Sequence, residues 1–143
     1  MRFMVIVPSS PESETGAMPN AEDLAKMGAF NEELVKAGLM LGGEGLHDSS
    51  KGARMTFGGK KPHVVDGPFT ESKELIAGFW ILQAKSKEEV VAWMSRAPFP
   101  PGVTLEIRQV HDAADFAPVD PTGELRANQE KLREQIAKRQ AKE

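Results

Sequence analysis

Side chains that can transfer protons are concentrated between residues 44 and 74 of the 143-residue chain. His47 is the best candidate for a general base, because imidazole changes its charge near neutral pH. Asp66 and Glu71 are the carboxylates that we expect to act with it as catalytic residues. An imidazole and a carboxylate in a dry cleft predict the transfer of a proton to or from a small organic molecule.

Residues suited to hold such a molecule follow the same histidine. Ser49, Lys51 and Arg54 lie in the loop that begins at His47. Hydroxyl groups beside cations suit a ligand with a carboxylate or phosphate group. The neighbouring segments supply the other ligand-binding candidates, which are Glu44, Phe69, Lys73 and Trp80.

Several of these candidates also have a structural interpretation, which the sequence leaves open. Asp66 opens an Asp-Gly-Pro turn, where an aspartate commonly accepts a backbone hydrogen bond. Glu71 and Lys73 would point the same way from an extended chain, either as an acid–base or anchoring pair or as an ion pair on the surface. Phe69 could fill the core under its loop instead of stacking on a ligand.

No metal or cofactor site is predicted. The histidines at positions 47, 63 and 111 lack the HxxxH, HxH or HExxH spacing of metal ligands. The chain has no GxGxxG or Walker nucleotide loop and no GxSxG hydrolase motif. It also has no cysteine, which excludes thiol catalysis and disulfides. We therefore expect chemistry without a cofactor.

The elements that must position these residues are strands and helices in alternation. Strands are predicted at residues 2–7, 39–46, 77–83 and 103–108, with a short hairpin of residues 54–57 and 63–65. A loop over residues 8–19 precedes a first helix, with Asn20 as its N-cap. A second helix begins with a capping box of Ser86 and Glu89 and ends before Pro98.

This order predicts a ferredoxin-like α+β fold, in which an antiparallel sheet carries two helices on one face and an inserted hairpin. The other face of the sheet still carries apolar side chains and must be covered. A second copy of the chain is the simplest cover, so we expect a homodimer.

The C-terminal part of the chain has a different character. We place a domain at residues 1–118 and a helical tail at residues 119–143, with Asp120 as the N-cap and Pro121 as the first helical residue. The apolar stripe of this helix is thin and consists of Leu125, Leu132 and Ile136. An isolated helix of this length is marginal in water, so we expect it either to dock on the domain or its dimer mate or to fray.

The composition is ordinary for a soluble globular protein, with 40% hydrophobic and 27% charged residues. The net charge of −3 argues against a general surface for nucleic acid or membranes. The N-terminal apolar run ends at Pro8 and is too short for a signal peptide or a membrane span. We therefore expect a cytoplasmic protein with a small-molecule ligand and no nucleic-acid or membrane partner.

Four segments of the chain resemble a known family. They are GGEGL at 42–46, HDSSKGAR at 47–54, DGPFTESKE at 66–74 and GFWIL at 78–82. As a set they resemble the DGPF branch of the YCII-related family, over residues 1–118. The resemblance implies a ferredoxin-like fold that dimerises through its sheets, the dimeric α+β barrel, and it leaves the C-terminal helix outside the usual core of the family.

The resemblance says less about activity than about fold. A His–Asp pair in a cleft points to enzymatic activity in the broader family, and some members of the DGPF branch lie beside, or are fused to, alternative sigma factors. The resemblance therefore implies a pocket in this chain, without assigning a catalytic residue.

Three functions are compatible with these observations. The leading one is a cofactor-independent enzyme that acts on a small organic molecule by acid/base chemistry in the cleft of the barrel. The alternative is a small-ligand-binding or regulatory module that uses the same cavity without turnover. The third is an interaction protein that works through its dimer and its C-terminal helix.

Overall fold

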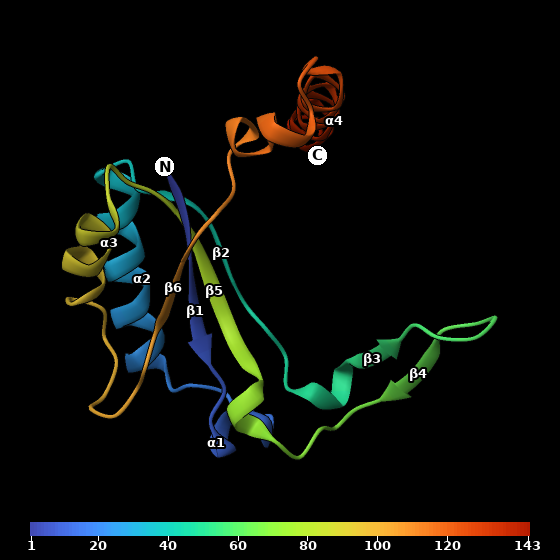
Figure 1. The fold of residues 1–143 in the computed structure, drawn as a ribbon. Coiled ribbons are helices and arrows are strands. Elements are labelled where there is room, and N and C mark those ends of the chain that lie inside the picture. The colour runs from blue at the N-terminus through green and yellow to red at the C-terminus, as the bar shows by residue number, and fades with distance from the viewer. The chain divides into compact units, whose positions relative to one another are not determined.

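The computed structural model describes residues 1–143 and divides into two compact units, Met1–Val110 and His111–Glu143 (Figure 1). The first unit contains the sheet and the two helices packed on it. The second unit contains the C-terminal helix. The domain boundary that we place after residue 118 lies later in the chain than this division and stays a prediction.

Four antiparallel strands form the sheet of the first unit. They are β1 (Arg2–Pro8), β2 (Met40–Gly45), β5 (Ile76–Gln83) and β6 (Glu106–Gln109), in the order β2-β5-β1-β6. The crossovers contain α2 (Ala21–Lys36) and α3 (Lys87–Met94), which lie on the same face of the sheet (Figure 1). This arrangement is ferredoxin-like, so the predicted α+β fold class is confirmed.

Side chains of β1 and β5 alternate between the two faces of the sheet, as the pleat requires. Phe3 lies opposite Leu82 and Val5 lies opposite Trp80, and these residues are buried on the face that the helices cover. The helices complete this core with Phe30, Leu34, Val90 and Met94.

Neither α2 nor α3 covers the opposite face of the sheet (Figure 1). Met4 lies opposite Ile81 and Ile6 lies opposite Phe79 on this face, and these four side chains are half-buried. We call this surface the open face. Its apolar character agrees with the prediction that something outside the protomer's own helices must cover it.

Local capping explains where the two core helices begin. The side chain of Asn20 accepts a hydrogen bond from the backbone N–H of Asp23 at 2.8 Å, so α2 begins as predicted. The hydroxyl of Ser86 likewise accepts from the N–H of Glu89 at 3.2 Å. The Glu89 carboxylate, however, accepts from the N–H of Lys85 instead of Ser86, so only half of the predicted capping box is formed.

Two predictions about the elements of the first unit are wrong. The segment expected to be a loop contains a short helix, α1 (Pro11–Glu14), which Ser10 caps. The last strand begins at Glu106 instead of residue 103. Extending the pairing with β1 would bring residue 104 opposite Pro8, which has no N–H to donate.

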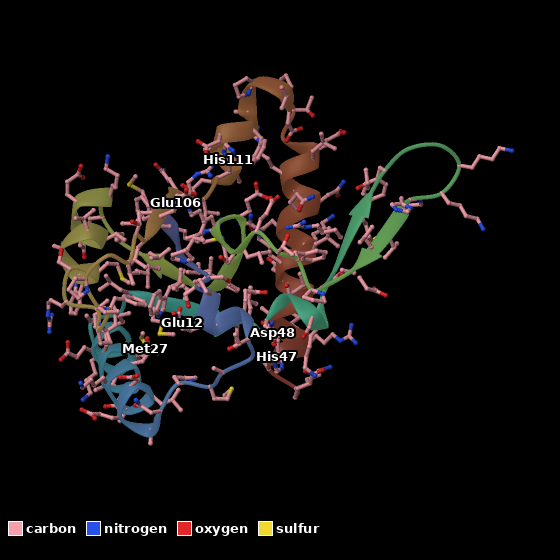
Figure 2. The ribbon with its side chains drawn as sticks, turned by 90° about the horizontal axis from the view of Figure 1, so that it is seen from below. Glu12, Met27, His47, Asp48, Glu106 and His111 are labelled. Carbon is pink, nitrogen blue, oxygen red and sulfur yellow. The ribbon has the colours of Figure 1, made fainter.

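The predicted hairpin is confirmed and forms a separate two-stranded sheet. It consists of β3 (Ala53–Thr56) and β4 (His63–Asp66), and every residue of both strands is exposed. The hairpin is inserted between β2 and β5 and projects from the sheet on the side away from α2 and α3 (Figures 1 and 2).

The second unit contains a 3-10 helix, η3 (Ala113–Val119), and α4 (Glu124–Gln140). The helix predicted to begin at Pro121 begins at Glu124, after Gly123, whose φ of 79° is left-handed. Asp120 is therefore not the N-cap residue. Its carboxylate instead reaches forward to accept hydrogen bonds from the backbone N–H groups of Leu125 and Arg126.

Candidate functional site

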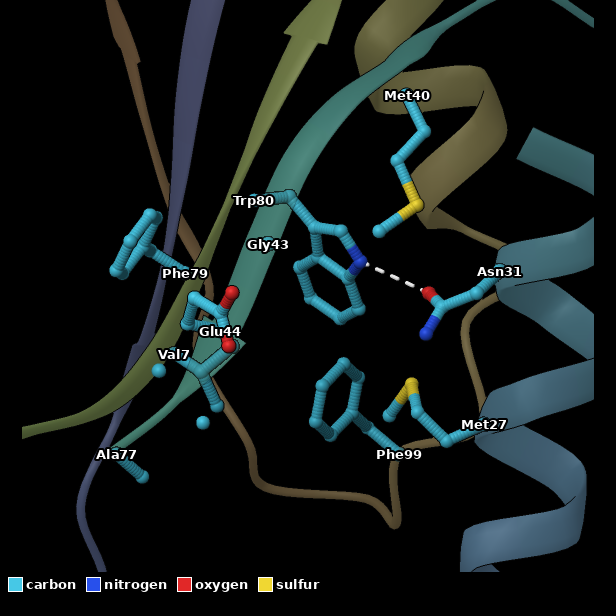
Figure 3. Close-up of a pocket in the computed structure, with 12 residues that line it drawn as sticks. Val7, Met27, Asn31, Met40, Gly43, Glu44, Ala77, Phe79, Trp80 and Phe99 are labelled. Atoms are coloured by element: carbon cyan, nitrogen blue, oxygen red, sulfur yellow. Dashed lines mark hydrogen bonds between the residues drawn. The ribbon is translucent and has the colours of Figure 1, made fainter. Parts of the chain in front are cut away.

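The first candidate site is a cavity of about 250 Å³ between one end of the sheet and α2 (Figure 3). We call it the tryptophan cavity. Its walls are mostly apolar and include Val7, Met27, Met40, Phe79, Trp80 and Phe99. Asn31 of α2 and Glu44 of β2 supply polar side chains to the lining. Two of the predicted ligand-binding residues, Glu44 and Trp80, therefore line the same cavity.

Trp80 is held in one orientation within this cavity. Its indole Nε1 donates a hydrogen bond to Oδ1 of Asn31 at 2.9 Å. Phe30 and Phe99 meet the indole edge to face, with ring centroids 6.2 and 6.1 Å away. Such contacts are the preferred geometry for aromatic pairs, so the cavity has a preformed aromatic wall.

Gly43 makes room for this tryptophan. The two residues are opposite each other in the pairing of β2 with β5. A Cβ atom on Gly43 would lie 3.0 Å from Cδ1 of Trp80 and 3.2 Å from the Phe79 carbonyl oxygen. The absence of a side chain at Gly43 therefore permits close packing of β2 against Trp80.

Glu44 is the only ionisable side chain in the lining of the tryptophan cavity. It lies on β2 and is exposed, so water reaches its carboxylate. Figure 3 shows this carboxylate on the strand side of the cavity, with Asn31 on the helix side. Because Glu44 is opposite Phe79 in the pairing of β2 with β5, its side chain leaves the sheet on the open face, whereas Trp80 and Asn31 lie on the helix face.

The second candidate site is a cavity of about 420 Å³ that we call the loop cleft. It lies between residues 46–53, the start of β5, and the segment that contains Phe69. Its lining includes four predicted site residues, His47, Ser49, Lys51 and Phe69. The loop cleft is therefore where the local sequence cluster around His47 comes together.

Ser49 joins three separate segments at the loop cleft. Its hydroxyl donates to Oε2 of Glu14 at 2.6 Å, and its backbone N–H donates to the same carboxylate. The N–H of Phe69 donates to the Ser49 hydroxyl at 2.8 Å. The helix α1, the loop and the DGPF turn are thus tied together through one side chain.

Glu14 is a site residue that sequence reasoning missed. It lies in α1, in a segment that was expected to be a loop, and it lines the loop cleft. Its partner Ser49 is distant in sequence, so no local pattern links the two. The only available signal was a run of Ser, Pro and Glu, which predicts a polar turn equally well.

The DGPF turn packs against the same loop through its glycine and its phenylalanine. The N–H of Gly67 donates to the Gly52 carbonyl at 2.9 Å. The guanidinium carbon of Arg54 lies 3.9 Å from the centre of the Phe69 ring, a cation–π contact. Arg54 and Phe69, both predicted to bind a ligand, therefore contact each other.

His47 and Asp48 form an adjacent imidazole and carboxylate in the loop cleft (Figure 2). The hydroxyl of Ser50 donates to the Asp48 carboxylate, and this hydrogen bond is the largest cause that lowers the pKa of Asp48. Partial desolvation acts against it, while the Ser50 N–H and the neighbouring charge of His47 lower the pKa further. Asp48 is therefore held in its charged form beside the histidine.

The remaining predicted site residues line neither cavity. Asp66 lies opposite Ala53 at the base of the hairpin and is exposed. Glu71 and Lys73 are also exposed. The expectation that these two point the same way assumed an extended chain, and it is wrong because Ser72–Glu74 forms a 3-10 helix, η2.

No three or more His, Asp or Glu side chains come together in an arrangement that could bind a metal ion. Neither α2 nor α4, the two longest helices, nor any other helix combines the length and apolar character that a membrane span requires.

Comparisons with known proteins identify the family of the chain. Residues 1–117 match the family model described as the YCII-related domain. No curated protein matches the chain. Among solved structures, the chain is similar to a 5-chloro-2-hydroxyhydroquinone dehydrochlorinase from Burkholderia phenoliruptrix in complex with 2,5-dihydroxybenzoquinone. That similarity has a TM-score of 0.40 and 20% sequence identity, and it covers 80% of this chain and 98% of the other.

Proposed function

Because the chain belongs to the YCII-related family, we propose that it is a small-molecule enzyme that uses acid/base chemistry without a cofactor. We place it in the branch of the family that carries the DGPF signature, because Asp66–Phe69 and the segments around it have that pattern. We further propose that it acts in the cytoplasm as a homodimer, in which a second copy covers the open face, with neither nucleic acid nor membrane as a partner.

The tryptophan cavity is the observation that carries this proposal. A dry apolar cavity of about 150 Å³ is enough to hold a benzene molecule. A cavity of about 250 Å³ with the aromatic wall described above has room for a ring with substituents. The substrate class that fits is therefore a small aromatic or cyclic carbonyl compound, with its apolar ring against Trp80 and Phe99.

Two groups could transfer the proton. Glu44 is the ionisable residue in the lining of the tryptophan cavity, at the edge of the sheet, and is the first candidate. His47 lies three residues further along the chain in the loop cleft, beside Asp48, and is the second candidate. The roles first assigned to Asp66 and Glu71 have less support, because neither residue lines a cavity.

One observation favours the alternative, a ligand-binding or regulatory module without turnover. Apart from Glu44, the residues that line the tryptophan cavity are apolar side chains, glycines and one asparagine. Such a lining can select a ligand by shape without reacting with it. Binding and turnover must therefore be measured separately.

The test is a thermal-shift screen with small phenols, benzoic acids and quinones, followed by assays of turnover on each compound that binds. A ligand at about 100 times its Kd stabilises the folded state by about 2.7 kcal/mol, which raises Tm by several degrees. We expect Glu44→Gln to retain this shift and to lose turnover, because it keeps the shape of the side chain and removes the base.

Two further variants complete this experiment. His47→Ala tests the second candidate base, and His63→Ala is its matched control, since His63 is exposed on the hairpin and lines neither cavity. Binding without turnover of any compound by the wild type would favour the binding module. If no compound raises Tm in the wild type, the tryptophan cavity is not the site for such ligands and the proposal is wrong.

A further inference from the structure

The β3–β4 hairpin exposes apolar side chains that the protomer does not cover. Met55 and Val64 are opposite each other in the hairpin and so lie on the same face, and they are 56% and 53% exposed. Phe57, just after β3, is 80% exposed. A two-stranded hairpin without a third layer is marginally stable in water, so this one requires a covering surface.

The hairpin and the open face border the same space. The hairpin leaves the sheet after β2 and returns before β5, the strand that supplies Phe79 and Ile81 to the open face. Both views of the molecule show it projecting on the side of the sheet that α2 and α3 do not occupy (Figures 1 and 2). A molecule seated on the open face would therefore meet the hairpin as well.

The charges on the chain favour a second copy in that space. The hairpin, residues 53–66, contains Arg54, Lys60, Lys61 and Asp66, which give it a net charge of +2. The rest of residues 1–110 contains nine Lys and Arg and thirteen Asp and Glu, a net charge of −4. A basic projection from one copy is thus complementary to the acidic body of another.

We propose that the β3–β4 hairpin is a dimerisation arm, which lies against a second copy of the chain that is seated on the open face. A two-fold axis would make the contact reciprocal, so that each copy contributes an arm to the other. This inference rests on the homodimer in the proposed function. It adds that Met55, Val64 and Phe57 are buried only in the dimer.

Sedimentation equilibrium on two adjacent variants of the arm tests the proposal. Met55→Asp places a charge on the face with Val64, whereas Thr56→Asp places the same charge on the opposite face of the same strand. Burying an unpaired carboxylate in an apolar contact is unfavourable, so we expect Met55→Asp to raise the dimer Kd by at least about tenfold. Thr56→Asp should change the Kd by less than about threefold. Equal effects of the two variants, or a wild type that remains monomeric, would overturn the proposal.

Hydrogen exchange on the wild-type protein provides a second measurement, which does not depend on whether a variant folds. The amides of residues 53–66 should exchange at least about tenfold more slowly at protein concentrations above the dimer Kd than below it. The buried centre of β5 serves as the internal reference, because its protection does not require a partner. A dimer whose hairpin exchanges at the same rate at both concentrations would show that the arm is not in the interface.

These experiments also separate the arm from the proposed chemistry. The thermal shift produced by a ligand can be measured on Met55→Asp with the same compounds. A variant that becomes monomeric and still binds the ligand would support the arm without bearing on the enzyme. If the Met55→Asp variant remains dimeric but a ligand raises its Tm less than that of the wild type, the view that the arm serves only association would be contradicted.

Discussion

Gly67, in the DGPF turn, is a glycine because another part of the backbone occupies the space of its side chain. A Cβ atom there would lie 1.8 Å from the Ser49 carbonyl oxygen. Its φ is not among the positive values found at other glycines, so conformational freedom is not the reason. The close approach of residues 49 and 67 is what brings the DGPF turn onto the loop that contains His47.

We predict that Gly67→Ala destabilises the first unit by about 2 kcal/mol or more, because the added methyl group must displace backbone atoms of the loop. Gly58→Ala is the control, since a Cβ at Gly58 has no neighbour within 4 Å. Urea denaturation of both variants measures the free energy of unfolding. Similar values for the two variants would show that the loop moves aside without penalty.

The candidate site was predictable where its residues are neighbours in sequence. His47, Ser49 and Lys51 follow one another in one loop, and all three line the loop cleft. Contacts between distant segments were not predictable in the same way. The hydrogen bond from the Ser49 hydroxyl to Glu14 is one example. The positions of Asp66 and Glu71, which line neither cavity, were not predictable either.

Among the elements, α4 shows how a helix can be capped from outside its own first turn. Asp120 is buried, and it accepts hydrogen bonds from the N–H groups of Leu125 and Arg126 and from the Arg126 guanidinium. These donors are otherwise left without partners at the start of a helix. The loop of Pro121–Gly123 lies between the aspartate and the helix, which is why the start of α4 was predicted too early.

This cap makes α4 sensitive to acid. Burial raises the pKa of Asp120, but the hydrogen bonds from Arg126 and Leu125 and the guanidinium charge lower it more, to below its usual value of 3.8. The folded state therefore gains stability from this group above about pH 4, and the gain is lost as pH falls through the lowered pKa. We predict that the helicity of α4 decreases on acidification below about pH 4.

Far-UV circular dichroism of two variants checks this prediction. Asp120→Asn should have lower helicity at neutral pH and a smaller acid transition, because the charged cap is already absent. Glu130→Gln, which changes an exposed carboxylate in the middle of α4, should keep the transition of the wild type. An identical acid transition in all three proteins would mean that Asp120 does not control the helix.

The beginnings of α2 and α3 were predictable for a simple reason. Asn20 and Ser86 each cap an N–H three residues ahead, so the signal and its partner lie in one short window. The end of a strand depends on its neighbour in the sheet, and the late start of β6 reflects Pro8 in β1. The starts of these two helices were therefore predicted better than the start of β6 or of α4, whose cap lies outside its first turn.

At the scale of the whole molecule, the strand order was predictable from the order of strands and helices along the chain, whereas the partner of the open face was not. Alternating apolar residues in β1 and β5 show that both faces of the sheet are partly apolar, but α2 and α3 cover only one of them. The chain divides after Val110, earlier than the boundary placed after residue 118, because η3 belongs to the second unit.

Because the two units are separately compact, we predict that deletion of residues 120–143 leaves the first unit intact. The Tm of its main transition should change by less than about 2 °C, and the ligand shift and the dimer should persist. Thermal denaturation and sedimentation of the truncated chain measure these properties. Loss of the dimer or of ligand binding would instead favour an interaction protein that works through its C-terminal helix.

The position of the hairpin also has a consequence for how the chain folds. The neighbouring strands β2 and β5 are separated by residues 46–75, and closing a loop of that length is slow and entropically unfavourable. β-Hairpins generally form by local contacts within about 1–10 microseconds, and this one brings Gly52 beside Gly67 in the folded protein. Once it has formed, the loop that remains to be closed is shorter, so an insertion that interrupts the sheet in sequence can speed the pairing of its strands.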